Sequence, residues 1–173
     1  MIEAAILVIF PFAMAFAAVS DVLSMTIQNR VTLLLVAAFI VLAPFTGMTM
    51  TDFGLHFVAG VAVLAVTFAL FATGSMGGGD AKLMSATALW LGWTPQLVTY
   101  LLAMTVLGGV LTLMILRYRA SAVAVYAGRV EFLRRLAQKD EGVPYGVALG
   151  LAGLWVFPQS VLGVWVIQRL SGI

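Results

Sequence analysis

Long runs without a single charged side chain divide this chain, and they restrict it to one class of structure. Five such runs cover residues 4–20, 31–51, 53–79, 83–116 and 142–168. A helix that crosses a lipid bilayer needs about 20 apolar residues. The run 83–116 has 34 residues, which is enough for two short crossings. The pattern therefore predicts an all-α polytopic membrane protein.

The composition excludes the other classes of protein. Hydrophobic residues make up 63% of the chain and charged residues 9%, whereas a soluble domain is about half apolar and about a quarter charged. A balance of 9 Lys and Arg against 7 Asp and Glu is far from the basic surface of a nucleic-acid-binding protein. Because the chain has no cysteine, it has no disulfide, thiolate metal site or cysteine nucleophile. No internal repeat or domain boundary is visible, so residues 1–173 are expected to form a single transmembrane domain.

About six spans are expected. Gly92-Trp93-Thr94-Pro95 divides the longest run, because proline ends a helix and tryptophan favours the membrane interface. The first run follows Glu3 and no Lys or Arg, so we interpret it as a retained helix rather than a secretory signal. The apolar tail 160–168 is too short to cross again, and it either extends the last helix past Pro158 or lies in the interface. The predicted spans are 3–20, 31–45, 54–73, 81–93, 96–116 and 143–157.

Basic residues predict the orientation of the spans. If the N-terminus lies outside, the loops 21–30, 74–82 and 117–141 face the cytoplasm and hold eight of the nine Lys and Arg residues, as the positive-inside rule requires. In 117–141, four apolar residues recur at helical spacing. This segment is either a basic amphipathic helix on an anionic lipid surface or a charged loop that fixes the topology. The four apolar residues are Val123, Tyr126, Val130 and Leu133.

Two acidic residues at predicted span ends are candidates for chemistry, because a carboxylate near hydrocarbon costs several kcal/mol. Asp21 ends the first span and Asp80 precedes the fourth. Two crossings separate them, so both emerge on the cytoplasmic side, while Asp52 is one crossing away and faces outward. Two carboxylates at one depth can share a proton, one activating water while the other protonates a carbonyl group. The alternative is that Asp80 is only the N-cap of a helix.

Three consecutive glycines precede the second of these aspartates. Glycine adopts backbone conformations that other residues avoid, and it allows another chain to approach closely. An extended peptide substrate would need such access, although glycines also form a simple turn between helices. The segment Gly77-Gly78-Gly79-Asp80 has the pattern GxGD, and Lys82 follows it.

Two further segments accompany this motif. After Asp21 come Ile27 and Asn29, with Gln28 between them, and Pro144-Tyr145-Gly146 precedes the last span. With these residues the chain resembles the GxGD membrane aspartyl proteases, in particular the prepilin peptidases of the type IV leader peptidase family. That family usually carries Ile-Pro-Asn in the first segment, so Gln28 is a departure from its pattern. The third segment resembles the PYG sequence of the family.

The resemblance implies a membrane-embedded aspartic endopeptidase that removes the basic leader of type IV prepilins or pseudopilins at the cytoplasmic face of the bacterial inner membrane. Asp21 and Asp80 would be catalytic without a metal or other cofactor, and the protein as a whole would be in contact with membrane lipid. The absence of paired cysteines is typical of the short form that serves tight-adherence (Flp, type IVb) pili, so N-methyltransferase activity is not expected; archaeal preflagellin peptidases are another short form. The supporting motif residues would be Gly77, Gly78, Gly79, Lys82 and Asn29.

Other functions remain compatible with the residues themselves. Asp21 and Asp80 could form the proton relay of an ion-coupled carrier, or they could only cap helices in a non-catalytic membrane subunit. A carrier more usually has inverted repeats and acidic residues near the bilayer midplane. His56 is expected to be an interfacial histidine without a catalytic role, and Tyr145 and Arg30 could touch a substrate.

Overall fold

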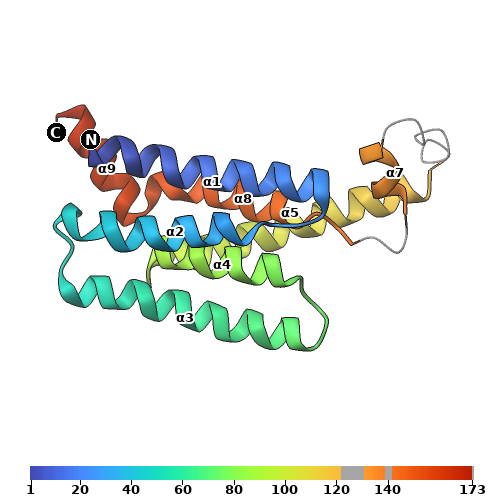
Figure 1. Cartoon of the computed structure of the whole chain (residues 1–173), viewed down its shortest axis with the longest axis horizontal. Helices are drawn as coiled ribbons and strands as arrows, with labels where there is room; N and C mark the ends of the chain where they lie inside the picture. The colour runs from blue at the N-terminus through green and yellow to red at the C-terminus, as the bar shows by residue number, and fades with distance from the viewer. Residues whose placement is uncertain (122–130, 139–141, 173) are drawn as a thin grey trace.

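The computed structural model describes residues 1–121, 131–138 and 142–172, and every regular element in these ranges is a helix. The long helices lie side by side in an elongated bundle (Figure 1). This confirms the predicted all-α class. The elements are α1 (Ile2–Ser24), α2 (Asn29–Leu42), the 3-10 helix η1 (Ala43–Thr46), α3 (Met50–Ala72), α4 (Gly78–Leu91), α5 (Pro95–Arg119), α7 (Glu131–Ala137), α8 (Gly146–Val156), the 3-10 helix η3 (Phe157–Gln159) and α9 (Val161–Ser171).

Four of these helical segments are long and apolar enough to cross a membrane: α1, α2 with η1, α3 and α5. The pair Gly146–Gln159 and Val161–Ser171, bent by 53°, would be a fifth. The chain is therefore a polytopic membrane protein, although the predicted count of six is not confirmed, since α4 has only 14 residues. The apolar tail forms a helix of its own, α9, which begins where the Ser160 side chain accepts a hydrogen bond from the Gly163 amide.

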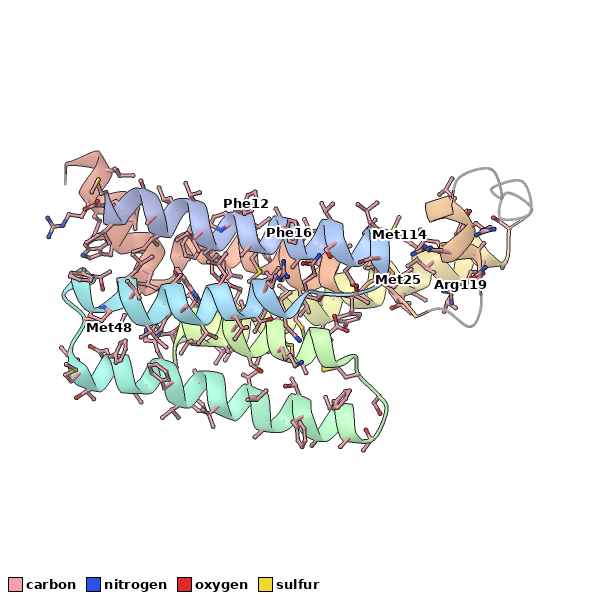
Figure 2. The ribbon with its side chains drawn as sticks, in the orientation of Figure 1. Phe12, Phe16, Met25, Met48, Met114 and Arg119 are labelled. Carbon is pink, nitrogen blue, oxygen red and sulfur yellow. The ribbon has the colours of Figure 1, made fainter. Side chains whose placement is uncertain are left out.

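The short helix α4 lies at the centre of the bundle. It contacts α2, α3, α5, α8 and α9, and all its residues from Leu83 to Leu91 are buried. A helix surrounded on every side presents small and apolar side chains to its neighbours. The longer helices expose apolar side chains instead: Phe12 and Phe16 point away from the bundle on the outer face of α1 (Figure 2), as expected for a surface in contact with lipid.

Aromatic rings pack around Trp90, near the C-terminal end of α4. Phe10 stacks on Phe157 with centroids 4.4 Å apart, and Trp90 of α4 lies 5.1 Å from Phe10 and 6.0 Å from Phe39. The Trp90 indole N–H donates a hydrogen bond to the Leu35 carbonyl at 2.9 Å, so its one polar atom is satisfied. We call these four rings, Phe10, Phe39, Trp90 and Phe157, the aromatic plug.

The loops α1–α2 and α3–α4 lie at one end of the bundle, together with α7, and both chain termini lie at the other (Figure 1). We call the first of these the loop end. There α7 is tied to α5, because the Tyr118 hydroxyl donates to the Leu133 carbonyl and Arg119 Nε donates to the Leu136 carbonyl. Arg119 is labelled beside α7 in Figure 2. Val123, Tyr126 and Val130 of the predicted amphipathic helix lie outside the described residues.

Candidate active site

Asp21 lies in the last turn of α1, and only 6% of its surface is exposed. The backbone N–H of Gly146, the first residue of α8, donates a hydrogen bond of 2.6 Å to Asp21 Oδ2. A Cβ atom at Gly146 would lie 2.8 Å from the Asp21 Cβ, so the two helices can approach this closely only because position 146 has no side chain. The end of α8 therefore holds one oxygen of a buried carboxylate.

Asp80 is the third residue of α4, and its side chain is partly buried. The N-cap of α4 is Gly77, and no side chain makes a capping hydrogen bond there. Asp80 is thus not the N-cap that the simple structural interpretation required. A Cβ atom at Gly77 would lie 2.7 Å from Asp80 Oδ2, so the glycine leaves room for the carboxylate.

The loop that follows Asp21 packs against the first turn of α4, which carries Asp80. A Cβ atom at Gly79 would lie 3.1 Å from the Ile27 Cβ, so the glycine motif fits closely against the loop that follows Asp21. Lys82 Nζ donates to Asn29 Oδ1 at 3.0 Å. The two predicted supporting residues thus bind each other, and they join the start of α2 to the first turn of α4.

Asp21 in the last turn of α1 and Asp80 in the first turn of α4 both lie at the loop end. Tyr145 directly precedes Gly146, whose amide binds Asp21. A Cβ atom at Gly108 of α5 would overlap the Tyr145 ring, so this glycine provides the space in which the ring lies. Residues from α1, α4, α5 and the start of α8 therefore meet at one point at the loop end.

Sequence reasoning identified Asp21, Asp80 and the segment around Tyr145, but it missed the contributions of Gly108 and of the Gly146 amide. Nothing in the local sequence distinguishes Gly108 from its neighbour Gly109. The Gly146 amide is a backbone group, so no side-chain pattern could have indicated its contact with Asp21.

Asp52 lies at the other end of the bundle, in the first turn of α3 (Figure 1). Its carboxylate accepts a hydrogen bond of 2.6 Å from the Thr49 hydroxyl. In return, the Asp52 backbone amide donates a hydrogen bond of 3.1 Å to the hydroxyl oxygen of Thr49. These bonds make it part of a helix N-terminus. His56, also near this end, is buried with 3% of its surface exposed, and it hydrogen-bonds the Leu89 carbonyl at 2.7 Å.

The structure also describes Arg30, a residue that was expected to be able to touch a substrate. Arg30 is exposed in the first turn of α2. Within the described ranges, no group of three or more His, Cys, Asp or Glu side chains is arranged to hold a metal ion.

A comparison with protein families matches residues 8–113 to the model described as the type IV leader peptidase family. The match extends from α1 into α5, so it includes both Asp21 and Asp80, while Tyr145 and Gly146 lie beyond it. No curated protein and no solved structure matches the chain. Because the matched region covers more than half of the chain and the fold has several helices that can cross a membrane, this chain belongs to the type IV leader peptidase family and is a membrane prepilin peptidase.

Proposed function

We propose that the protein is an aspartic endopeptidase in which Asp21 and Asp80 form the catalytic pair. The observation that carries this proposal is that Asp21 and Asp80, from separate motifs, lie at one end of the bundle in segments that pack closely against each other. A carboxylate pair of this kind can divide the roles of base and acid between its members.

The hydrogen bond from Gly146 supports a division of roles. A backbone N–H donor stabilises a carboxylate in its ionised form, so Asp21, which accepts this bond, is assigned the role of base. It takes a proton from a water molecule, whose oxygen then bonds to the scissile carbonyl carbon. Asp80, in its acid form, gives its proton to the carbonyl oxygen. When the resulting diol collapses, Asp21 gives its proton to the leaving nitrogen as the C–N bond breaks, and Asp80 takes a proton from a diol hydroxyl, which returns both carboxyl groups to their starting forms.

The glycine loop supports access by an extended peptide. Gly77 is exposed beside Asp80, and Gly74 in the same loop has a φ of +74°, a conformation that favours glycine. The bond between Lys82 and Asn29 holds the two motif loops together. In this proposal Gly78 and Gly79 keep the loop narrow, so that the substrate backbone can approach Asp80.

The substrate proposed is a type IV prepilin or pseudopilin of the Flp (IVb) kind, with a basic leader that is cut off before an apolar helix. Such a helix partitions into the bilayer, which brings the scissile bond to the depth of a site at a helix end. The site would face the cytoplasm in the bacterial inner membrane. The reaction as written needs water and the two carboxyl groups, without a cofactor, and methylation of the product is not part of it.

Asparagine substitutions test this assignment. Asn is nearly isosteric with Asp and can cap a helix, but it cannot act as a base. Asp21→Asn and Asp80→Asn are each expected to lower leader cleavage by about 10²- to 10⁴-fold, the range for general acid–base groups, while the protein still accumulates in the membrane. Cleavage of a candidate prepilin by the purified protein in detergent is measured by mass spectrometry.

Asp52→Asn is the matched control. This carboxylate lies at the opposite end of the bundle and bonds only within its own helix N-terminus in the contacts described above, so its replacement should leave cleavage near the wild-type rate. Cleavage at that rate by either Asp21→Asn or Asp80→Asn would show that the site is wrongly assigned.

A further inference from the structure

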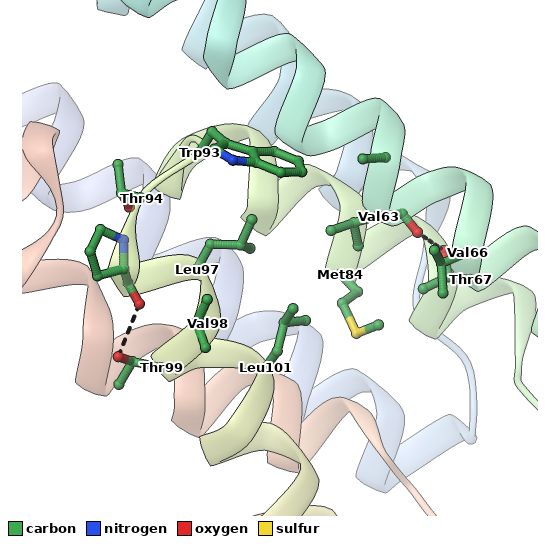
Figure 3. A pocket seen from close by; sticks show the side chains of 12 residues that line it. Val63, Val66, Thr67, Met84, Trp93, Thr94, Leu97, Val98, Thr99 and Leu101 are labelled. Atoms are coloured by element: carbon green, nitrogen blue, oxygen red, sulfur yellow. Dashed lines mark hydrogen bonds between the residues drawn. The ribbon is translucent and has the colours of Figure 1, made fainter.

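An apolar groove of about 890 Å³ separates α3 from α5. The two helices form its walls, and Met84 of the central helix α4 forms its floor (Figure 3). Such a volume corresponds to about two turns of an α-helix, if the helix with its side chains is about 10 Å across. Its lining includes Val66 and Thr67 on the α3 side, Trp93 and Thr94 at the turn between α4 and α5, and Val98 and Thr99 on the α5 side.

The groove offers an occupant little hydrogen bonding. The hydroxyl of Thr67 donates to the Val63 carbonyl at 2.8 Å, and that of Thr99 donates to the Pro95 carbonyl at 3.1 Å (dashed lines in Figure 3). Thr94, in the turn between α4 and α5, likewise donates to the Leu91 carbonyl at the end of α4, at 3.0 Å. With these donors satisfied and aliphatic side chains around them, the groove favours an apolar occupant.

One end of the groove lies near Asp80. Met84 follows Asp80 by one helical turn on α4, so the floor begins about 6 Å along the helix from the proposed catalytic residue. At the other end, Trp93 lies across the groove (Figure 3). An apolar segment in this groove would therefore extend away from Asp80, with one of its ends near the carboxylate.

We propose that this groove binds the apolar helix that follows the cleavage point of the substrate. The proposal rests on the proposed function, and it adds the place where the part of the substrate that remains in the membrane is held. A substrate seated here would present the start of its helix, and so its scissile bond, at the Asp80 end of the groove.

A second groove on the other side of α3 provides a comparison. It lies between α2 and α3, has a volume of about 280 Å³ and includes Lys82 in its lining. Val61 lines this smaller groove and Val66 the larger one, and both valines belong to α3 with 63% of their surface exposed. They form a matched pair that differs in the groove they face.

Single cysteines test the proposal directly, because the native chain has none. Val66→Cys and Val61→Cys proteins are each mixed in the membrane with a prepilin that carries one cysteine, moved through successive positions of its apolar segment. Asp80→Asn is added to each protein to keep the substrate uncleaved. Disulfide formation is read on a gel. We expect Val66→Cys to crosslink at positions that recur at helical spacing, with a yield at least about tenfold above that of Val61→Cys.

The outcomes separate this proposal from the proposed function. Equal crosslinking at the two positions, or stronger crosslinking at Val61→Cys, overturns the groove proposal if the same proteins with Asp80 restored cleave the substrate. The absence of crosslinks at both positions, with cleavage retained, means that lipid fills the groove, and this also overturns the proposal. If the wild-type protein cleaves no prepilin, the proposed function itself is wrong.

Discussion

At the scale of single residues, the contact between Gly146 and Asp21 is the most constrained feature of the site. A methyl group at position 146 would lie 2.8 Å from the Asp21 Cβ and 2.9 Å from Oδ2, so α1 and α8 would have to separate. We expect Gly146→Ala to lower cleavage by about 10²-fold, the cost of a misplacement of about 1 Å. The measurement is the rate of leader removal at equal amounts of protein in the membrane.

Gly142→Ala is the control for this prediction. It precedes the same helix, and a Cβ atom there has nothing within 4 Å. Its carbonyl, which accepts a hydrogen bond from Arg119, is retained in the variant. If Gly146→Ala cleaves as fast as Gly142→Ala, the close approach at Asp21 is not needed for activity.

The location of both aspartates at one end of the bundle could be predicted from the sequence, whereas the contacts that hold them there could not. An even number of crossings brings Asp21 and Asp80 to one end of the bundle whatever the side-chain packing. The contact with Gly146 joins residues 125 positions apart, and it depends on how α1 packs on α8, about which the uncharged runs carry no information.

At the scale of the elements, α5 approaches Tyr145 through Gly108. A Cβ atom at Gly108 would overlap the Tyr145 ring, whereas one at the adjacent Gly109 would meet nothing within 4 Å. We expect Gly108→Ala to displace the ring, and with it the adjacent Gly146 that holds Asp21, and to lower cleavage by about tenfold or more, since catalysis is sensitive to small displacements. Cleavage assays and thermal unfolding in detergent measure the two effects separately.

Gly109→Ala should cleave at the wild-type rate and should stabilise α5 by up to about 1 kcal/mol, because alanine favours the helix. Equal loss of activity in the two variants would indicate that any added methyl group in this part of α5 is harmful. That result would contradict a specific role for the space at Gly108.

The central helix illustrates how far helix positions could be predicted. A span was expected at 81–93, but α4 begins at Gly78 and ends at Leu91. Two glycines in the first turn disfavour a helix by about 1 kcal/mol each, so local propensity gave no reason to start it there. Burial against five neighbouring elements outweighs that cost.

In the C-terminal tail, the bend between η3 and α9 could not be predicted either. A Cβ atom at Gly163 would overlap the Phe157 carbonyl, and the apolar run gave no indication of this close contact.

At the scale of the whole molecule, the basic residues gather at the loop end. Arg169 lies in α9, at the end that holds the chain termini. The positive-inside rule predicts that the loop end faces the cytoplasm. A reporter fused after Arg119 should therefore indicate the cytoplasm, and one fused at Thr51 should indicate the outer side; the reverse result at either site would contradict this orientation. The described basic residues on the elements of the loop end are Arg30, Lys82, Arg117, Arg119, Arg134 and Arg135.

The aromatic plug has a consequence for the movement of protons across the membrane that contains the protein. Asp21 is three residues from the last residue of α1, so about 5 Å of helix separates it from the loop end. Farther into the bundle, the stacked rings of Phe10 and Phe157 and the indole of Trp90 close the space between α1, α4 and η3. If Asp21 and Asp80 exchange protons as proposed, we expect those protons to return to water at the loop end. The proposed site should then not discharge a proton gradient across the bilayer that contains it.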